Sequence, residues 1–87
     1  MADKITYFAI VDPGTDIERP LGLLRRLEHD DGPSDEALTK DLSWSFTPLI
    51  VEWEHGSYER ELVEVSHEQA GRIVRYFREQ IAGNADL

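Results

Sequence analysis

A single amphipathic stripe near the C-terminus sets the strongest limit on what this chain can fold into. From Ser66 onward, apolar side chains recur at helical spacing: Ala70, Ile73, Val74, Phe77 and Ile81. At 100° per residue they share one face that is about 100° wide. Ser66 and Gln69 form a capping box, and Gly83 is a typical stop signal. The pattern predicts a helix over 67–82 whose stripe must be buried against another layer.

Two apolar segments upstream supply strands for that layer. Lys4–Val11 carries apolar side chains at both alternating sets of positions, which is typical of a strand covered on both faces. Asp12-Pro13-Gly14 then ends it. The segment Pro20–His29 fits either a short helix or a strand. Gly22 and the short length favour a strand that pairs back on the first one.

The middle of the chain has mixed preferences. Ser34 is a typical N-cap, so we expect a short helix from Asp35 to Asp41, followed by an extended segment Leu42–Phe46. Residues 49–55 fit a helix and a strand equally well, and both alternatives stay open. Tyr58–Val65 has the composition of a strand.

These elements predict one domain, residues 1–87, of the α+β class. We expect a small, mainly antiparallel sheet with the C-terminal amphipathic helix (about 67–82) packed on one face. A chain of 87 residues buries only about 60–65% of the surface that it exposes when unfolded. It therefore supports one modest core and no second domain.

Acidic residues outnumber basic residues two to one. Asp and Glu number 18, Lys and Arg number 9, and the formal net charge is -9. Phosphate binding needs clustered cations, and anionic lipids repel such a surface, so we expect no direct nucleic-acid binding and no membrane binding. The same field favours a basic protein partner. The absence of cysteine and of an apolar leader leads us to expect a cytoplasmic protein.

Few residues of the chain suggest chemistry. His29 lies beside Asp30 and Asp31, but neighbours in a turn rarely converge on one metal ion. Glu52 and Glu54 form a carboxylate pair of the catalytic kind only if their segment is a strand. The common phosphate-binding loops and the zinc-protease and serine-hydrolase motifs are absent from the sequence. We predict no catalytic residue, no cofactor and no metal ligand, and hence no enzyme.

Three aromatic residues are the candidates for an interaction surface: Trp44, Trp53 and Tyr58. Tryptophan and tyrosine are enriched among the residues that dominate binding energy at protein interfaces. We therefore predict a small acidic interaction or accessory protein without catalysis, in which charge steers the encounter and exposed aromatics anchor it. The uncovered edges of a small sheet also allow a homodimer.

Two other functions stay open at this point. An acidic inhibitor that mimics nucleic acid and blocks a basic DNA-binding protein requires carboxylates along one continuous face. A small hydrolase or metal-dependent enzyme requires a pocket that holds at least two groups among His29, His55 and the Glu52/Glu54 pair.

Three segments of the chain carry a resemblance to other proteins: Tyr7-Phe8-Ala9-Ile10-Val11-Asp12, Gly22-Leu23-Leu24-Arg25-Arg26 and Glu61-Leu62-Val63-Glu64-Val65-Ser66. In these segments, and over most of its length, the chain resembles short acidic bacterial proteins of unassigned function. The shared motifs are structural, so the resemblance implies no catalytic residue and no ligand.

Overall fold

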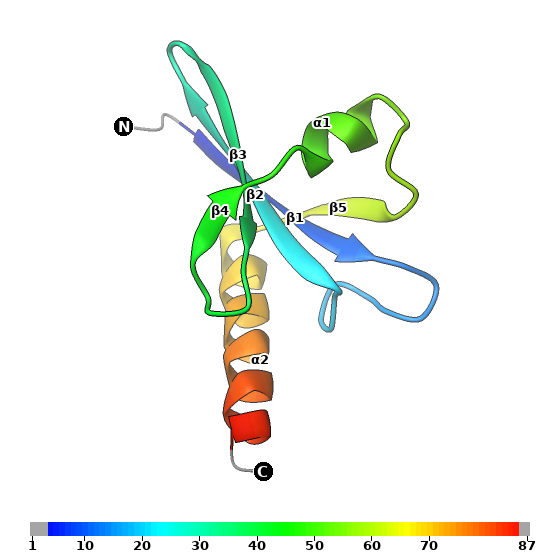
Figure 1. Cartoon of the computed structure of the whole chain (residues 1–87), viewed down its shortest axis with the longest axis vertical. Coiled ribbons are helices and arrows are strands. Elements are labelled where there is room, and N and C mark those ends of the chain that lie inside the picture. Colours follow the sequence, from blue (N-terminus) through cyan, green and yellow to red (C-terminus); the bar gives the residue numbers. More distant parts are fainter. Residues whose placement is uncertain (1–3, 86–87) are drawn as a thin grey trace.

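A computed structural model describes residues 4–85 as a sheet of five strands with two helices. The strands are β1 (Lys4–Val11), β2 (Gly22–His29), β3 (Gly32–Leu38), β4 (Trp44–Phe46) and β5 (Glu61–Val65), and the helices are α1 (Leu49–Glu54) and α2 (His67–Ala85). The strand order is β4-β3-β2-β1-β5, and every neighbouring pair is antiparallel. The predicted α+β class, with an antiparallel sheet and a C-terminal helix, is confirmed (Figure 1).

Strand β1 lies inside the sheet, between β2 and β5. Its neighbouring residues Ala9 and Ile10 are both buried, yet they belong to two different core clusters, one on each face of the sheet. This explains why Lys4–Val11 is apolar at both alternating sets of positions. The predictions of a doubly covered first strand, and of a second strand that pairs back on it, are confirmed.

Helix α2 covers one face of the sheet with the predicted stripe. Ala70 and Ile73 pack against Ala9 and Leu23 in a buried cluster. At the start of the helix, the Gln69 N–H donates to Ser66 Oγ at 3.0 Å, as the capping motif predicts. The Gln69 side chain does not complete the box, because its Oε1, the atom that would accept from the Ser66 N–H, accepts from Arg72 instead. Its Nε2 donates to the Ile17 carbonyl at 3.0 Å. That bond ties the β1–β2 loop to the helix.

The end of α2 differs from the prediction. The helix runs through Gly83 and ends at Ala85. A glycine ends a helix when its backbone turns left-handed, and within residues 4–85 only Gly32 and Gly56 do so among the glycines. The C-terminal end of α2 extends beyond the sheet (Figure 1), so no packing against the sheet requires the helix to end at Gly83. Neither helix in this range is long and apolar enough to cross a membrane.

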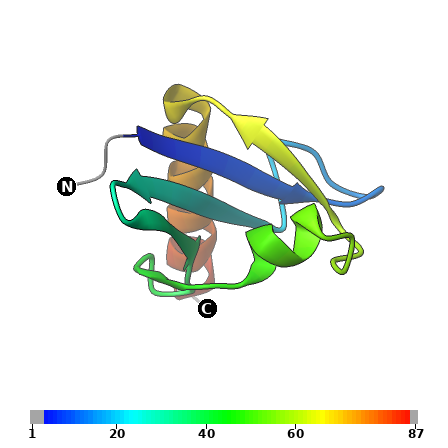
Figure 2. The same ribbon diagram turned by 90° about the horizontal axis from the view of Figure 1, so that it is seen from above.

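Helix α1 covers part of the opposite face, which resolves the open alternative for residues 49–55 in favour of a helix. Ile50 is fully buried and packs with Ile10, Leu24 and Leu62. In Figure 2, α2 lies behind the strands, whereas α1 lies at the lower right and not behind them. The sheet therefore has two small cores, one under each helix.

The predicted helix from Asp35 to Asp41 is wrong, because most of this segment is strand β3. Gly32, with a φ of 121°, closes a tight turn after Asp30 and Asp31 and sends the chain back along β2. Burial of Ala37 and Leu38 against the two cores, together with cross-strand pairing, outweighs the local capping preference of Ser34. Tertiary contacts decide this segment.

Two further strands are shorter than predicted. Of the extended segment Leu42–Phe46, only Trp44–Phe46 is strand, because Leu42 has a left-handed φ of 65° in the turn that precedes it. Of Tyr58–Val65, only Glu61–Val65 pairs with β1. The sheet therefore has one edge strand of three residues and one of five.

Candidate functional site

The surface around strand β4 exposes apolar side chains that the two cores do not use. Phe46, the last residue of β4, is 81% exposed, and Val51 on α1 is 43% exposed. A shallow pocket beside them is also lined by Pro33 and Pro48. We call these four residues the β4 surface. We take this group of exposed apolar side chains as the candidate contact site.

Trp44 lies two residues before Phe46 and is held from two sides. The guanidinium carbon of Arg25 lies 4.1 Å from the centre of its ring, a cation–π contact. Glu36 fixes that arginine through a distance of 2.6 Å between Arg25 Nη2 and Glu36 Oε1. The ring of Tyr7 lies 6.2 Å from that of Trp44. These contacts make Trp44 a half-buried, positioned ring next to Phe46.

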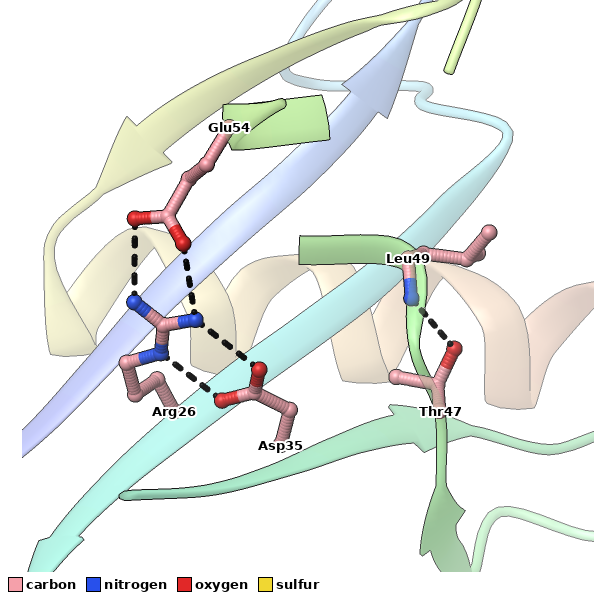
Figure 3. Close-up of polar contacts among 5 residues, drawn as sticks. All are labelled: Arg26, Asp35, Thr47, Leu49 and Glu54. Atoms are coloured by element: carbon pink, nitrogen blue, oxygen red, sulfur yellow. Dashed lines mark hydrogen bonds and ion pairs between the residues drawn. The ribbon is translucent and has the colours of Figure 1, made fainter. Parts of the chain in front are cut away.

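Arg26, Asp35 and Glu54 form an ion cluster (Figure 3), and Asp35 lines the same pocket as the β4 surface. Arg26 Nε donates to Asp35 Oδ1 at 2.8 Å, and Nη2 donates to Asp35 Oδ2 at 2.9 Å. Nη1 and Nη2 each donate to a Glu54 oxygen at 3.1 Å. The hydrogen bonds to Asp35 first, and to Glu54 second, raise the pKa of Arg26 above its ordinary value.

The ion cluster is a structural tie and not a ligand site. Its three members come from β2, β3 and the last residue of α1, so it fastens the helix to the sheet. Four of the five guanidinium N–H groups of Arg26 already point at carboxylates, which leaves little capacity to bind a phosphate. At the other end of α1, the Leu49 N–H donates to Thr47 Oγ1 at 3.2 Å. Helix α1 is therefore held at both ends.

The structure separates the three aromatic residues selected from the sequence. Trp44 packs with the core under α2, whereas Trp53 and Tyr58 pack with the core under α1. The ring of Trp53 lies 6.2 Å from that of Phe8, and both Trp53 and Tyr58 are half-buried. Among the three, Trp44 is the one that lies in β4, two residues before Phe46. The role of all three in binding stays a prediction.

The titratable groups that suggested chemistry do not converge. His29, Asp30 and Asp31 line a pocket at the β2–β3 turn, whereas Glu52 lies on α1 and His55 directly follows it. Because residues 49–54 are helical, Glu52 and Glu54 point apart, and Glu54 is engaged with Arg26. Within residues 4–85 there is no group of three or more His, Asp or Glu side chains placed to hold a metal ion.

His67 has a packing role that the sequence did not indicate. Its Nε2 lies 3.1 Å from the Ile5 carbonyl oxygen, and its ring meets Tyr7 edge-on with 5.1 Å between the ring centres. A carbonyl oxygen only accepts, so Nε2 carries the proton in this contact. His67 thus joins the start of α2 to β1.

Phe46 is the residue that the sequence reasoning missed. Its signal was present, since Trp44 and Phe46 alternate in an extended segment and therefore share a face. Trp44 pairs with Leu38 and Phe46 with Glu36 in the register of β3 and β4. What the sequence did not show is that this face lies at the edge of the sheet, where nothing covers Phe46.

Comparisons with known proteins give no relative: no family model, no curated protein and no solved structure matches the chain.

Proposed function

We propose that this chain is a small non-catalytic protein that binds a basic protein partner in the cytoplasm, with Phe46 on the β4 surface as its anchor. The observation that carries the proposal is the 81% exposure of Phe46 on a chain of net charge -9. Folding gains little from a side chain in that position. Aromatic residues, phenylalanine included, are enriched in protein interfaces relative to the rest of the surface.

The expected energetic contribution of Phe46 is large for one residue. Full burial of a phenylalanine side chain is worth roughly 1.5–3 kcal/mol. About 2 kcal/mol corresponds to a roughly thirtyfold change in affinity. Other exposed apolar residues, such as Leu21 and Ile81, line a different pocket from the β4 surface and make matched controls.

The net charge supports a partner of opposite sign. Eighteen acidic residues face nine basic ones, and Arg25, Arg26 and Arg72 are already engaged in ion pairs. The uncompensated carboxylates create a negative field that raises the association rate with a basic protein at low salt. The interaction should therefore weaken as ionic strength increases.

The distribution of the acids does not favour the nucleic-acid mimic. Asp16 and Glu18 lie in the β1–β2 loop, and Asp30 and Asp31 lie in the β2–β3 turn at the opposite end of β2. A strand of eight residues spans about 25 Å, so these groups are well separated. The separated histidines likewise give no support to a hydrolase.

The test is capture of partners from the native host's lysate at low and high salt, with the wild type, Phe46→Ala and Ile81→Ala. We expect a basic protein that the wild type and Ile81→Ala retain at low salt, and that Phe46→Ala loses. Retention that is equal for all three proteins would overturn the role of Phe46. Retention of no partner at low salt would overturn the proposed function.

A further inference from the structure

The two edge strands of the sheet differ in how well they are protected. β5 carries two glutamates among its five residues, Glu61 and Glu64, and charged side chains are a common defence of a sheet edge. β4, with the sequence Trp-Ser-Phe, carries no charge. It therefore presents an uncharged edge three residues long.

The backbone of β4 has hydrogen-bonding groups that the sheet does not use. The Thr39 N–H donates to Ser43 O at 2.8 Å, and the Thr47 N–H donates to Asp35 O at 3.1 Å. Hydrogen-bonded pairs recur at every second residue of an antiparallel ladder, and the Ala37–Ser45 pair lies midway between these two. The N–H and C=O of Ser45 therefore point toward β3. By the same alternation, those of Trp44 and Phe46 point outward from the edge. Two residues thus offer two donors and two acceptors.

The side chains above this edge are arranged to receive a second strand. Trp44 and Phe46 lie on the same face of the sheet, while Ser45 lies on the other. Opposite residues in antiparallel strands point to the same face, so the residues of an added strand opposite Trp44 and Phe46 contact these rings. Those residues are two positions apart in the added strand. The edge therefore selects apolar side chains at alternate positions.

The charges at the two ends of β4 indicate the sign of the occupant. Asp41 lies in the turn before β4 and accepts hydrogen bonds from Ser43 and Thr39, which hold it in place. Glu52 lies on α1, one residue after Val51 of the β4 surface, and is exposed. The nearby cations are Lys40, which lies beside Asp41, and Arg25 on the Trp44 ring, whose charge Glu36 neutralises. A segment with lysine or arginine on either side of its apolar residues matches this arrangement.

We propose that β4 binds an extended, basic segment of the partner protein by strand addition. The segment adds antiparallel to β4 and forms up to four main-chain hydrogen bonds with Trp44 and Phe46, with its alternate apolar side chains on those two rings. This inference rests on the proposed function and specifies the chemistry of its partner. A second copy of the chain is a poor occupant, because it brings a charge of -9 and the three-residue edge is small for a stable dimer.

The test is a selection from a library of random twelve-residue peptides against the wild type, Phe46→Lys and Ile81→Lys. Phe46→Lys places a charge on the edge strand, as natural sheets do to prevent pairing with another strand. Because position 46 is exposed, the substitution should leave the fold intact, and circular dichroism checks this. We expect selected peptides rich in lysine and arginine with apolar residues two apart. Their binding should fall at least tenfold with Phe46→Lys and less than twofold with Ile81→Lys.

Amide exchange then distinguishes strand addition from docking of side chains alone. With a selected peptide bound, the outward N–H groups of Trp44 and Phe46 should exchange at least tenfold more slowly, while that of Ser45, already bonded to β3, should change little. Any one of three results would overturn the inference: neither outward N–H group exchanges more slowly, the selected peptides are acidic, or the peptides bind Phe46→Lys as well as the wild type. A lysate partner that requires Phe46 but leaves these two N–H groups unprotected would preserve the proposed function and reject strand addition.

Discussion

Replacement of Asp35 by alanine tests the ion cluster that positions the β4 surface. The Asp35 side chain is 7% exposed and that of Arg26 is 18% exposed, so their pairing is largely shielded from water. Loss of one partner from a buried pair costs roughly 3–5 kcal/mol. We expect about 3 kcal/mol, because Glu54 still neutralises Arg26. For a domain of this size the melting temperature should fall by roughly 12–24 °C.

The matched control is Glu36→Ala, which removes the neighbouring carboxylate of β3 from the Arg25 pair. Glu36 is 29% exposed and water screens its ion pair, so the loss should be about 1 kcal/mol or less. Urea unfolding followed by tryptophan fluorescence measures both variants on the same scale. If Asp35→Ala costs no more than Glu36→Ala, the ion cluster is not the tie between α1 and the sheet.

Three further predictions concern α1, α2 and the turn before β4. Ile50→Ala should cost roughly 3 kcal/mol, and Val51→Ala at the exposed neighbour less than about 0.5 kcal/mol, in urea unfolding. Gly71→Ala should add about 0.5–1 kcal/mol in thermal unfolding, because the added methyl group meets nothing within 4 Å. Hydrogen bonds, first from Ser43, lower the pKa of Asp41, so NMR should find a low midpoint that rises in Ser43→Ala. Its stabilising effect is present above about pH 4 and is lost as the pH falls through the folded-state pKa.

The elements that the sequence predicted best are those in which the local pattern and the packing agree. The α2 stripe reads as a helix on its own, and packing against Ala9 and Leu23 requires the same helix. The two-faced apolar pattern of β1 likewise matches its place inside the sheet. Local preference and burial point to one structure in both cases, so the interpretation did not depend on knowing the rest of the fold.

The segment from Ser34 to Phe46 shows why the remainder was not predictable. Ser34 has the local chemistry of a helix cap, but its neighbours Asp35 and Glu36 find arginines across the hairpin. Those partners lie about ten residues earlier in the chain, and only the turn at Gly32 brings them alongside. A hairpin register of this kind is set by long-range pairing and not by the preference of any one residue.

The candidate site was only partly visible in the sequence for the same reason. The size of Trp44 made it a candidate, whereas Phe46, in the same predicted extended segment, was not among the candidates. Whether such a face is covered depends on the order of strands in the sheet, which leaves β4 at the edge. Trp53 was equally prominent in the sequence, and it packs with the core under α1 as Trp44 packs with the core under α2.

The most direct measurement is the hydrogen-exchange footprint of the captured partner on this chain. If a partner binds along β4, exchange should slow at Trp44 and Phe46 when the partner is bound, and it should not change at Arg78–Ile81 on the exposed end of α2 or along β5. A footprint on α2 or β5, with residues 44–46 unchanged, would contradict the assignment of the interface to β4.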